Sequence, residues 1–241
     1  DRNFMLKDKK CWAFVPARGG SKSIKLKNLV ELNGKPLLDY GINASLKSKI
    51  FDRIIVSTDH NSIAKRSIYL GAEVDYRPQM LCGDDVAVID VVREFISRQS
   101  SLPDIIFLIQ PTSPFILASH ISKLYELMIQ DELCESGQTV AKVPHNYHAW
   151  NQRSIENSHS SFFYKKERET AFNKQRKPNL YSFGNLTALK TKFLYRNLGF
   201  FAEPSCALEI KWPYNIDVDG ADDVKLASSI LKSNFVDKEL L

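Results

Sequence analysis

The sequence lacks long apolar runs. No stretch approaches the roughly 20 apolar residues that a membrane-spanning helix needs, and the first five residues contain no signal-peptide core. The chain has 241 residues, of which 44% are hydrophobic and 25% charged, as in ordinary globular proteins. We therefore expect a single domain, residues 1–241, that is cytoplasmic and has no membrane partner.

The sequence also lacks clustered cysteines. Its four cysteines lie far apart and form neither a C-x-x-C pair nor a Cys/His cluster, at Cys11, Cys82, Cys134 and Cys206. This spacing argues against a zinc site and against a disulfide framework. We expect all four to be reduced residues that pack in the interior.

No aromatic-basic module of the kind that binds RNA is present either. The formal net charge is +5, but the excess is spread along the chain except near residues 14–28 and 165–177. A diffuse excess of this size does not mark a nucleic-acid surface. We expect no nucleic-acid partner.

The most unusual chemistry lies in residues 14–28, FVPARGGSKSIKLKN. An apolar run ends at Ala17, and a loop follows that contains Arg18, the Gly19–Gly20 pair and Lys22. Glycine lets backbone N–H groups approach an anion, and Arg and Lys add charge and hydrogen bonds. The P-loop and dinucleotide fingerprints are both absent. The loop is therefore either a polyphosphate site of another kind or a solvated basic connection.

Strand and helix patterns alternate along the first 143 residues and resume after residue 183. Strands are predicted at 11–16, 54–59, 73–76, 104–110, 138–143, 186–189 and 207–210. Helices are predicted at 37–46, 62–70, 86–97, 119–129 and 222–231, with Asp84 or Asp85 as the N-cap of the third. This order predicts an α/β fold, a mostly parallel sheet flanked by helices.

Polar residues follow several of the predicted strands. They are Arg18 and Lys22, Thr58 and Asp59, Arg77, and the segment from Gln110 to Ser113. Ligands of parallel sheets bind beyond the carboxyl ends of the strands. We expect these side chains to converge on one edge of the sheet.

The alternation fails over residues 144–183, which are rich in Asn, Ser, Lys and Arg and contain several aromatics. No element is predicted there with any strength. A lid, an excursion to a partner subunit and a disordered insertion are all consistent with this composition.

Asp217 and Asp219 form a second chemical signal. In a strand or tight turn, residues two apart point the same way, so two carboxylates face one cation. Mg²⁺ prefers a few carboxylates together with water and phosphate oxygens. The alternative is a solvated acidic turn in which Asp219 or Asp222 caps the last helix.

Several of these segments together resemble the CMP-sialic acid synthetases, the N-acylneuraminate cytidylyltransferases, which couple a nine-carbon acidic sugar to CTP. The matching segments are ARGGSK at 17–22, LKN at 26–28, GKPL at 34–37, RP at 77–78, LIQPTSP at 108–114, FF at 200–201 and IDVD at 216–219 with Asp223. The resemblance extends from Ala13 to about Ala227. It implies a Rossmann-like nucleotidyltransferase fold and a homodimer in which residues 144–183 pack on the second subunit.

The resemblance also implies roles for single residues. CTP is expected at Ala17, Arg18, Gly19, Ser21, Lys22, Lys27, Asn28 and Arg77. Catalysis is expected from Arg18, Lys22, Lys27 and Asp219, with Mg²⁺ on Asp217 and Asp219. The acceptor sugar is expected at Gln110, Thr112, Lys174, Phe200 and Phe201.

The departures from the family pattern lie mainly on the acceptor side. Phe115–Ile116 stands where the family usually has Leu-Arg, and Lys174–Gln175 where it has Arg-Gln. Lysine does not form the same bidentate clamp on a carboxylate. The expected reaction is transfer of CMP from CTP to an acidic nonulosonate, with release of pyrophosphate. The alternatives are another acid, such as a phosphonate or an octulosonate, and a catalytically inactive nucleotide-binding module.

Overall fold

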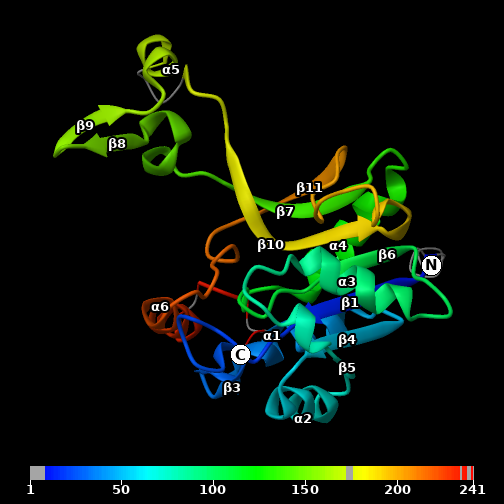
Figure 1. Cartoon of the computed structure of the whole chain (residues 1–241). Coiled ribbons are helices and arrows are strands. Elements are labelled where there is room, and N and C mark those ends of the chain that lie inside the picture. The colour runs from blue at the N-terminus through cyan, green and yellow to red at the C-terminus, as the bar shows by residue number, and fades with distance from the viewer. Residues whose placement is uncertain (1–8, 172–175, 234, 238–239, 241) are drawn as a thin grey trace.

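The computed structural model describes residues 9–171, 176–233, 235–237 and 240. A seven-stranded sheet in the order β11-β7-β10-β6-β1-β4-β5 forms its centre (Figure 1). The strands are β1 Cys11–Pro16, β4 Arg53–Thr58, β5 Glu73–Tyr76, β6 Ile105–Leu108, β7 Ser136–Lys142, β10 Tyr181–Lys190 and β11 Ser205–Ile210. Within this sheet, as far as the described residues extend, only the pairings of β10 with β6 and β7 are antiparallel. The predicted α/β class, with a mostly parallel Rossmann-like sheet, is confirmed.

Helices cover both faces of the sheet because successive residues of a buried strand point to opposite sides. Ala13 and Val15 of β1 face the core under α1 Leu37–Ser48, α2 Asn61–Tyr69 and α4 Ala118–Gln130. Trp12 and Phe14 face the opposite core, under α3 Val88–Ser97. A third cluster packs α6 Ala221–Leu231 near the hairpin of β2 Glu31–Leu32 and β3 Lys35–Pro36.

The predicted elements occur, β1 and β5 with the predicted bounds and the others with shifted ends. The third helix starts at Val88, and neither Asp84 nor Asp85 caps it, since its N-cap is Ala87 without a side-chain bond. The strand expected at 186–189 begins instead at Tyr181, with an irregularity between Phe183 and Thr187. The irregularity surrounds Gly184, where a β carbon would lie 2.5 Å from Thr139 Oγ1. Here β10 therefore depends on a residue without a side chain.

An arm, formed by residues 144–171 and 176–180, projects from the sheet between β7 and β10 (Figure 1). It contains the short 3₁₀ turns η4 His145–Tyr147 and η5 Ala149–Asn151, the hairpin of β8 Arg153–Glu156 with β9 His159–Phe162, and the short helix α5 Lys165–Thr170. The sequence pattern predicted none of these elements. Packing of the arm on a second subunit remains a prediction.

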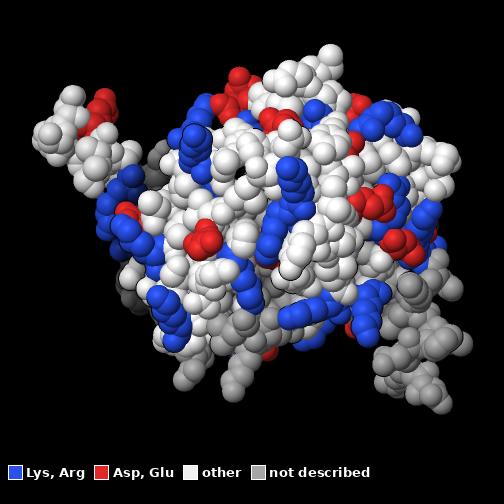
Figure 2. Space-filling model, turned by 90° about the horizontal axis from the view of Figure 1, so that it is seen from below, with Lys and Arg blue, Asp and Glu red and all other residues white. Residues whose placement is uncertain are grey.

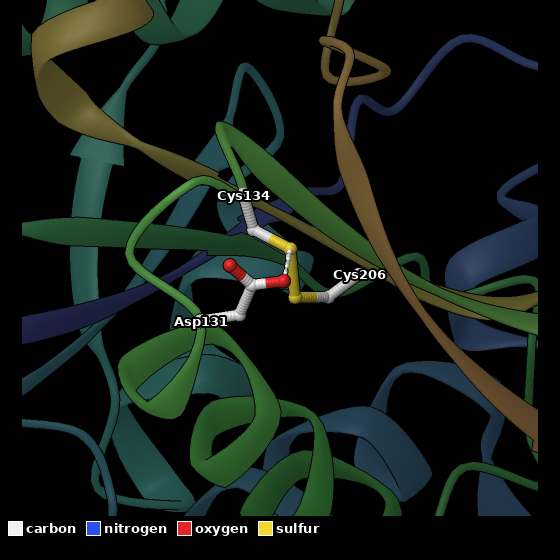
Figure 3. Close-up of side chains that lie close together, drawn as sticks. All are labelled: Asp131, Cys134 and Cys206. Atoms are coloured by element: carbon white, nitrogen blue, oxygen red, sulfur yellow. Dashed lines mark hydrogen bonds between the residues drawn. A yellow bond between two sulfur atoms is a disulfide. The ribbon is translucent and has the colours of Figure 1, made fainter.

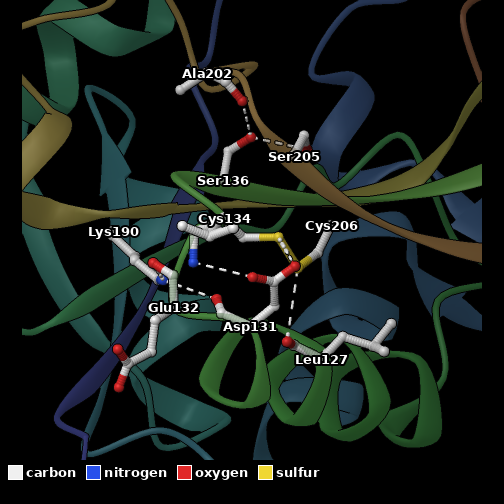
Figure 4. Close-up of a disulfide and its surroundings, with 10 residues drawn as sticks. Leu127, Asp131, Glu132, Cys134, Ser136, Lys190, Ala202, Ser205 and Cys206 are labelled. Carbon is white, nitrogen blue, oxygen red and sulfur yellow. Dashed lines mark hydrogen bonds between the residues drawn. A yellow bond between two sulfur atoms is a disulfide. The ribbon is translucent and has the colours of Figure 1, made fainter.

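The cysteine prediction was wrong for one pair. Cys134 and Cys206 form a disulfide across 72 residues of sequence (Figure 4). Cys11 and Cys82 are free cysteines. Cys134 precedes β7, and Cys206 lies in β11, which pairs in parallel with β7. Sequence spacing alone did not reveal that these two strands are neighbours.

Charge is distributed broadly over the face seen in Figure 2. Lys and Arg side chains are interspersed there with Asp and Glu and separated by uncharged residues. This agrees with the diffuse excess of positive charge in the sequence. Among the described residues, none of the helices has both the length and the apolar character needed to cross a membrane.

Candidate active site

The loop after β1 is tied to the end of β4. Ala17 N donates to Ser57 O at 2.9 Å, which continues the strand pairing by one residue. Gly19 N donates to the Asp59 carboxylate at 2.6 Å. A charged acceptor makes this last bond a strong one. The loop is thereby fixed at the carboxyl edge of the sheet.

The two glycines of this loop have different surroundings. A β carbon on Gly19 would lie 2.8 Å from Cβ of His60, so the close approach to the next loop requires glycine there. A β carbon on Gly20 would have no heavy atom within 4 Å. Asn28 is buried and donates to Arg18 O at 2.9 Å, which closes the far end of the loop.

Three cationic side chains of the predicted phosphate site, Arg18, Lys22 and Lys27, each pair with a carboxylate. Arg18 Nη2 lies 2.6 Å from Asp84 Oδ1, and Lys22 Nζ lies 2.9 Å from Asp84 Oδ2. Lys27 Nζ lies 3.2 Å from Asp219 Oδ1. The loop and the segment of Asp217 and Asp219 are therefore in direct contact, through Lys27 and Asp219, which are 192 residues apart in sequence.

Two adjoining cavities lie at this edge. The loop cavity, of about 400 Å³, is lined by Arg18, Ser21, Lys22, Ser23, Lys27, Asp84 and Asp219. The strand-end cavity, of about 280 Å³, is lined by Pro16, Arg18, Gly20, Ser21, Lys27, Asn28, Val88, Leu108, Gln110, Pro111 and Thr112. Arg18, Ser21 and Lys27 line both. The structure thus brings the loop, the QPTSP segment and Asp219 to one place.

Asp217 is held against the segment after β6. Its carboxylate accepts a bond from Ser113 Oγ at 3.4 Å, and Val218 N donates to Thr112 O at 2.7 Å. Partial burial raises the pKa of the Asp217 carboxyl, and the nearby Asp219 charge raises it further, against a hydrogen bond from Thr112 that lowers it. Burial and the Asp219 charge thus both disfavour the ionised form of Asp217.

Asp223, and neither Asp219 nor Asp222, caps the last helix. Its Oδ2 accepts bonds from Asp219 N at 3.0 Å and Gly220 N at 2.8 Å. This corrects the capping alternative for the acidic turn. The Asp219 side chain therefore does not cap the helix. It lies at the cavity, where it forms an ion pair with Lys27.

Arg77 lies beneath the loop. It is 9% exposed, and its guanidinium donates to Ser57 O at 3.1 Å and to Ser57 Oγ at 3.3 Å. Burial lowers the pKa of Arg77, and the Arg18 charge adds to this, while Cys82, Asp59 and Asp75 act against it. Its side chain lines neither of the two cavities.

The residues predicted for the acceptor do not all gather. Gln110 and Thr112 line the strand-end cavity. Phe200 is buried in the core under α3, while Phe201 is 56% exposed and stands edge-on to Phe183, with ring centroids 5.5 Å apart. Lys174 lies outside the described residues.

Sequence reasoning missed Asp84 and Ser113 as parts of the site. Asp84 was considered only as a helix cap, although its position shortly after Arg77–Pro78 was a usable signal. Ser113 lay inside a segment already singled out, but nothing local indicated its contact with Asp217, 104 residues away. Both depend on long-range contacts.

A further group with ligand-type atoms lies away from this edge. Asp131, Cys134 and Cys206 bring a carboxylate and two sulfurs within 4.8 Å of one another (Figure 3). Both sulfurs belong to the disulfide. In this state they are not thiolate ligands, so the trio is not a metal site.

The family described as Cytidylyltransferase matches residues 12–217 of the chain. N-acylneuraminate cytidylyltransferase A of Danio rerio is 42% identical over 116 residues, which are 48% of this chain and 27% of that protein. Pseudaminic acid cytidylyltransferase of Campylobacter jejuni is 32% identical over 122 residues, 49% of this chain and 53% of that protein. The chain thus matches about a quarter to a half of the length of these relatives.

Two solved structures share the fold. CMP:2-keto-3-deoxy-manno-octonic acid synthetase, complexed with CTP, superposes with a TM-score of 0.71 at 16% identity and covers 92% of this chain and 98% of its own. 4-Diphosphocytidyl-2C-methyl-D-erythritol synthase of Anaerococcus prevotii superposes with a TM-score of 0.66 at 14% identity and covers 95% of this chain and 99% of its own. At such identities the likeness extends to the fold.

Proposed function

The chain belongs to the cytidylyltransferase family, and from this premise we propose that it transfers CMP from CTP to the hydroxyl group of an acidic nonulosonate sugar. The sugar oxygen forms a bond to the α-phosphorus, the bond from that phosphorus to the bridging oxygen breaks, and pyrophosphate and the hydroxyl proton leave. The observation that carries the proposal is the cavity where Arg18, Lys22, Lys27 and Asp219 meet.

In this proposal the loop holds the phosphates. Arg18 and Lys22 line the loop cavity and provide hydrogen bonds and positive charge for the triphosphate. Positioning and charge neutralisation supply most of the catalysis in phosphoryl-type transfers. The same two cations stabilise the charge that develops on departing pyrophosphate. Arg77, buried beneath the loop, supports the loop's base through Ser57.

The donor atoms near Asp219 suit Mg²⁺, the metal that we propose. Asp217 and Asp219 offer carboxylate oxygens; burial raises the pKa of Asp217, and the neighbouring Asp219 charge also raises it. Mg²⁺ favours such hard oxygen ligands and would neutralise phosphate oxygens of the nucleotide. In the structure, the Lys27 ammonium group supplies a positive charge beside Asp219.

For the acceptor, we propose binding beside Gln110 and Thr112, with Phe201 and Phe183 forming an aromatic wall. The curated relatives named after N-acylneuraminate and pseudaminic acid support a nonulosonate. Because one of the similar solved structures is an octonic acid synthetase, an octulosonate is an alternative acceptor. A phosphonate is a further alternative acceptor.

The arm supports the proposal of a homodimer. Aromatic and aliphatic side chains on it are exposed, among them Tyr147 at 72%, Ile155 at 79% and Phe163 at 67%. Light scattering behind size-exclusion chromatography tests this proposal. A monomer at all concentrations would contradict it.

We also propose a cytoplasmic enzyme, and the disulfide makes this testable. Disulfides are rare in cytosolic proteins. In the cell, mass spectrometry after alkylation in the lysate should therefore find Cys134 and Cys206 as reduced thiols, and the disulfide of the structure should form only when the purified protein is oxidised. Complete recovery of the disulfide would contradict the proposed location.

One assay tests the proposed reaction. The purified protein, given Mg²⁺ and CTP, should release pyrophosphate with one member of a panel of nonulosonic, octulosonic and phosphonic acids. The responding acid identifies the acceptor class. Tight CTP binding without release on any acid would support the inactive nucleotide-binding module instead.

A further inference from the structure

Asp84 uses both of its carboxylate oxygens to hold the loop cations. Oδ1 lies 2.6 Å from Arg18 Nη2, and Oδ2 lies 2.9 Å from Lys22 Nζ. The hydrogen bond from Lys22 has the larger effect in lowering the pKa of the Asp84 carboxyl, and the bond from Arg18 lowers it further. Asp84 is therefore ionised at neutral pH. One anion thus bridges two cations that come from the predicted phosphate loop.

The bridge lies within the loop cavity. Asp84 lines that cavity together with the cations Arg18, Lys22 and Lys27. Among the described residues, each of these cations is already paired with a carboxylate, and Asp219 is the partner of Lys27. A triphosphate that binds Arg18 and Lys22 must therefore compete with Asp84 for the same donors.

Helix capping does not account for Asp84. Helix α3 begins at Val88, its N-cap is Ala87, and no side chain caps it. Arg18 also donates to Cys82 O at 3.3 Å, which brings the segment just before Asp84 to the loop. The contacts of Asp84 thus point to the phosphate loop.

We propose that Asp84 is an exchangeable counter-anion of the phosphate loop, which holds Arg18 and Lys22 before the nucleotide arrives and is displaced by the phosphate chain. The inference rests on the proposed function and adds a determinant of triphosphate affinity and pyrophosphate release. Surface ion pairs are weak, and Lys22 is 82% exposed, so a polyanion with more charge displaces the carboxylate. After the reaction, Asp84 competes with pyrophosphate and speeds its departure.

The chain offers a matched control. Asp85 carries the same charge next to Asp84 and, among the described residues, makes no hydrogen bond or ion pair. Replacing either residue by Asn changes the net charge equally. Both variants change the overall electrostatic field in the same way. Any difference in anion affinity between them therefore comes from the bridge between Asp84 and the cations Arg18 and Lys22.

The test is calorimetric titration of the full chain with inorganic tripolyphosphate, without added metal. Asp84→Asn should bind about 3- to 10-fold more tightly than the wild type, the range for two weak ion pairs, whereas Asp85→Asn should change the dissociation constant less than about two-fold. Asp84→Glu should stay near the wild type. Thermal melting confirms that the variants fold.

Three outcomes would overturn the inference, and they are distinguishable. If the wild type binds tripolyphosphate but Asp84→Asn binds no better than Asp85→Asn, the counter-anion role is wrong and the proposed function stands. Weaker binding by Asp84→Asn would instead assign Asp84 to holding Arg18 in its binding position. If the wild type binds no tripolyphosphate, the phosphate assignment of the loop fails, and the role of Asp84 fails with it.

Discussion

The loop edge of the sheet and the arm differ in how their residues find partners. At the loop edge, charged side chains pair over long sequence distances, as Lys27 does with Asp219 across 192 residues. Within the arm, polar contacts are local: Arg168 and Lys177 both donate to Asn151, 17 and 26 residues away. The loop edge is held by the fold of the whole sheet, whereas the arm is held mainly by itself.

This difference bears on which half of the proposed site a single chain completes. The loop cavity gathers side chains from three distant segments, represented by Arg18, Asp84 and Asp219. On the acceptor side, Phe200 is in the core, and Phe201 is largely exposed. The described part of one chain therefore gathers the predicted nucleotide residues in one cavity, whereas the predicted acceptor residues are spread over the cavity, the core and the surface.

The largest effect is expected from Asp219→Ala, which removes one carboxylate from the loop cavity. Pyrophosphate release should fall about 10³-fold, roughly 4 kcal/mol of transition-state stabilisation. Asp222→Ala is the control, because Asp222 is exposed and pairs with Lys225 away from the cavity. A steady-state assay with CTP and the responding acid measures both. An unchanged rate for Asp219→Ala would remove the metal role from this residue.

The disulfide provides a test that changes stability and leaves the loop edge intact. It closes a 72-residue segment that includes the whole arm, so its loss should lower the free energy of unfolding by roughly 3 kcal/mol. Replacing Cys134 and Cys206 by Ala should lower Tm by about 10 °C. CTP affinity at 25 °C should not change. A loss of CTP affinity would mean that the two edges of the sheet are coupled.

Reduction of the wild type supplies the control for this prediction. Dithiothreitol should lower the Tm of the wild type toward that of the double variant and leave the double variant unchanged. An equal shift in both proteins would show that the reductant acts elsewhere.

Local patterns predicted the parallel core well, because buried strands and amphipathic helices carry their own periodicity. The strand Glu73–Tyr76 has the predicted bounds, and the helix expected at 119–129 spans Ala118–Gln130. The same reasoning failed for the arm, whose β8–β9 hairpin contains no buried residue and so has no buried face to set a pattern. Periodicity reports burial, and the arm buries little within one chain.

The candidate site also contains features that local sequence predicted and features that it missed. The loop and Asp219 were predicted, because glycine, charge and a family resemblance coincide in short segments. The disulfide and the Asp84 bridge were missed, because each joins two positions whose proximity arises from strand order or loop packing. Arg77 was predicted as a nucleotide contact, but its burial beside Ser57 is a property that no local pattern reports.

His120 connects the segment after β6 with β10 and with the segment before α6, and its titration tests these contacts. It accepts a bond from Leu117 N, lies 3.3 Å from Asn185 Nδ2 and stacks edge-on against Tyr214. Burial, with a smaller effect of Lys123, lowers its pKa from 6.5 to about 4. The native state therefore holds the neutral ring, while the unfolded state takes up a proton below about pH 6.5.

The stability that depends on neutral His120 is present above about pH 6.5 and is lost as the pH falls toward 4. At pH 5 the loss should be on the order of 2 kcal/mol, measured by urea unfolding at pH 7 and pH 5. The loss should be smaller in His120→Gln, which cannot take up the proton. An equal loss in both proteins would assign the acid sensitivity to other groups.

The smallest effect is expected at the two adjacent phenylalanines, and it distinguishes the acceptor site from the core. Phe201→Ala removes an exposed ring that faces Phe183, so KM for the acid should rise about five-fold with kcat within two-fold, the size of one lost aromatic contact. Phe200→Leu, at a position 3% exposed, should lower the free energy of unfolding by about 1 kcal/mol and leave KM unchanged. If instead Phe200→Leu raises KM and Phe201→Ala does not, the acid binds against the core side of this pair, and the aromatic wall proposed for the acceptor is wrong.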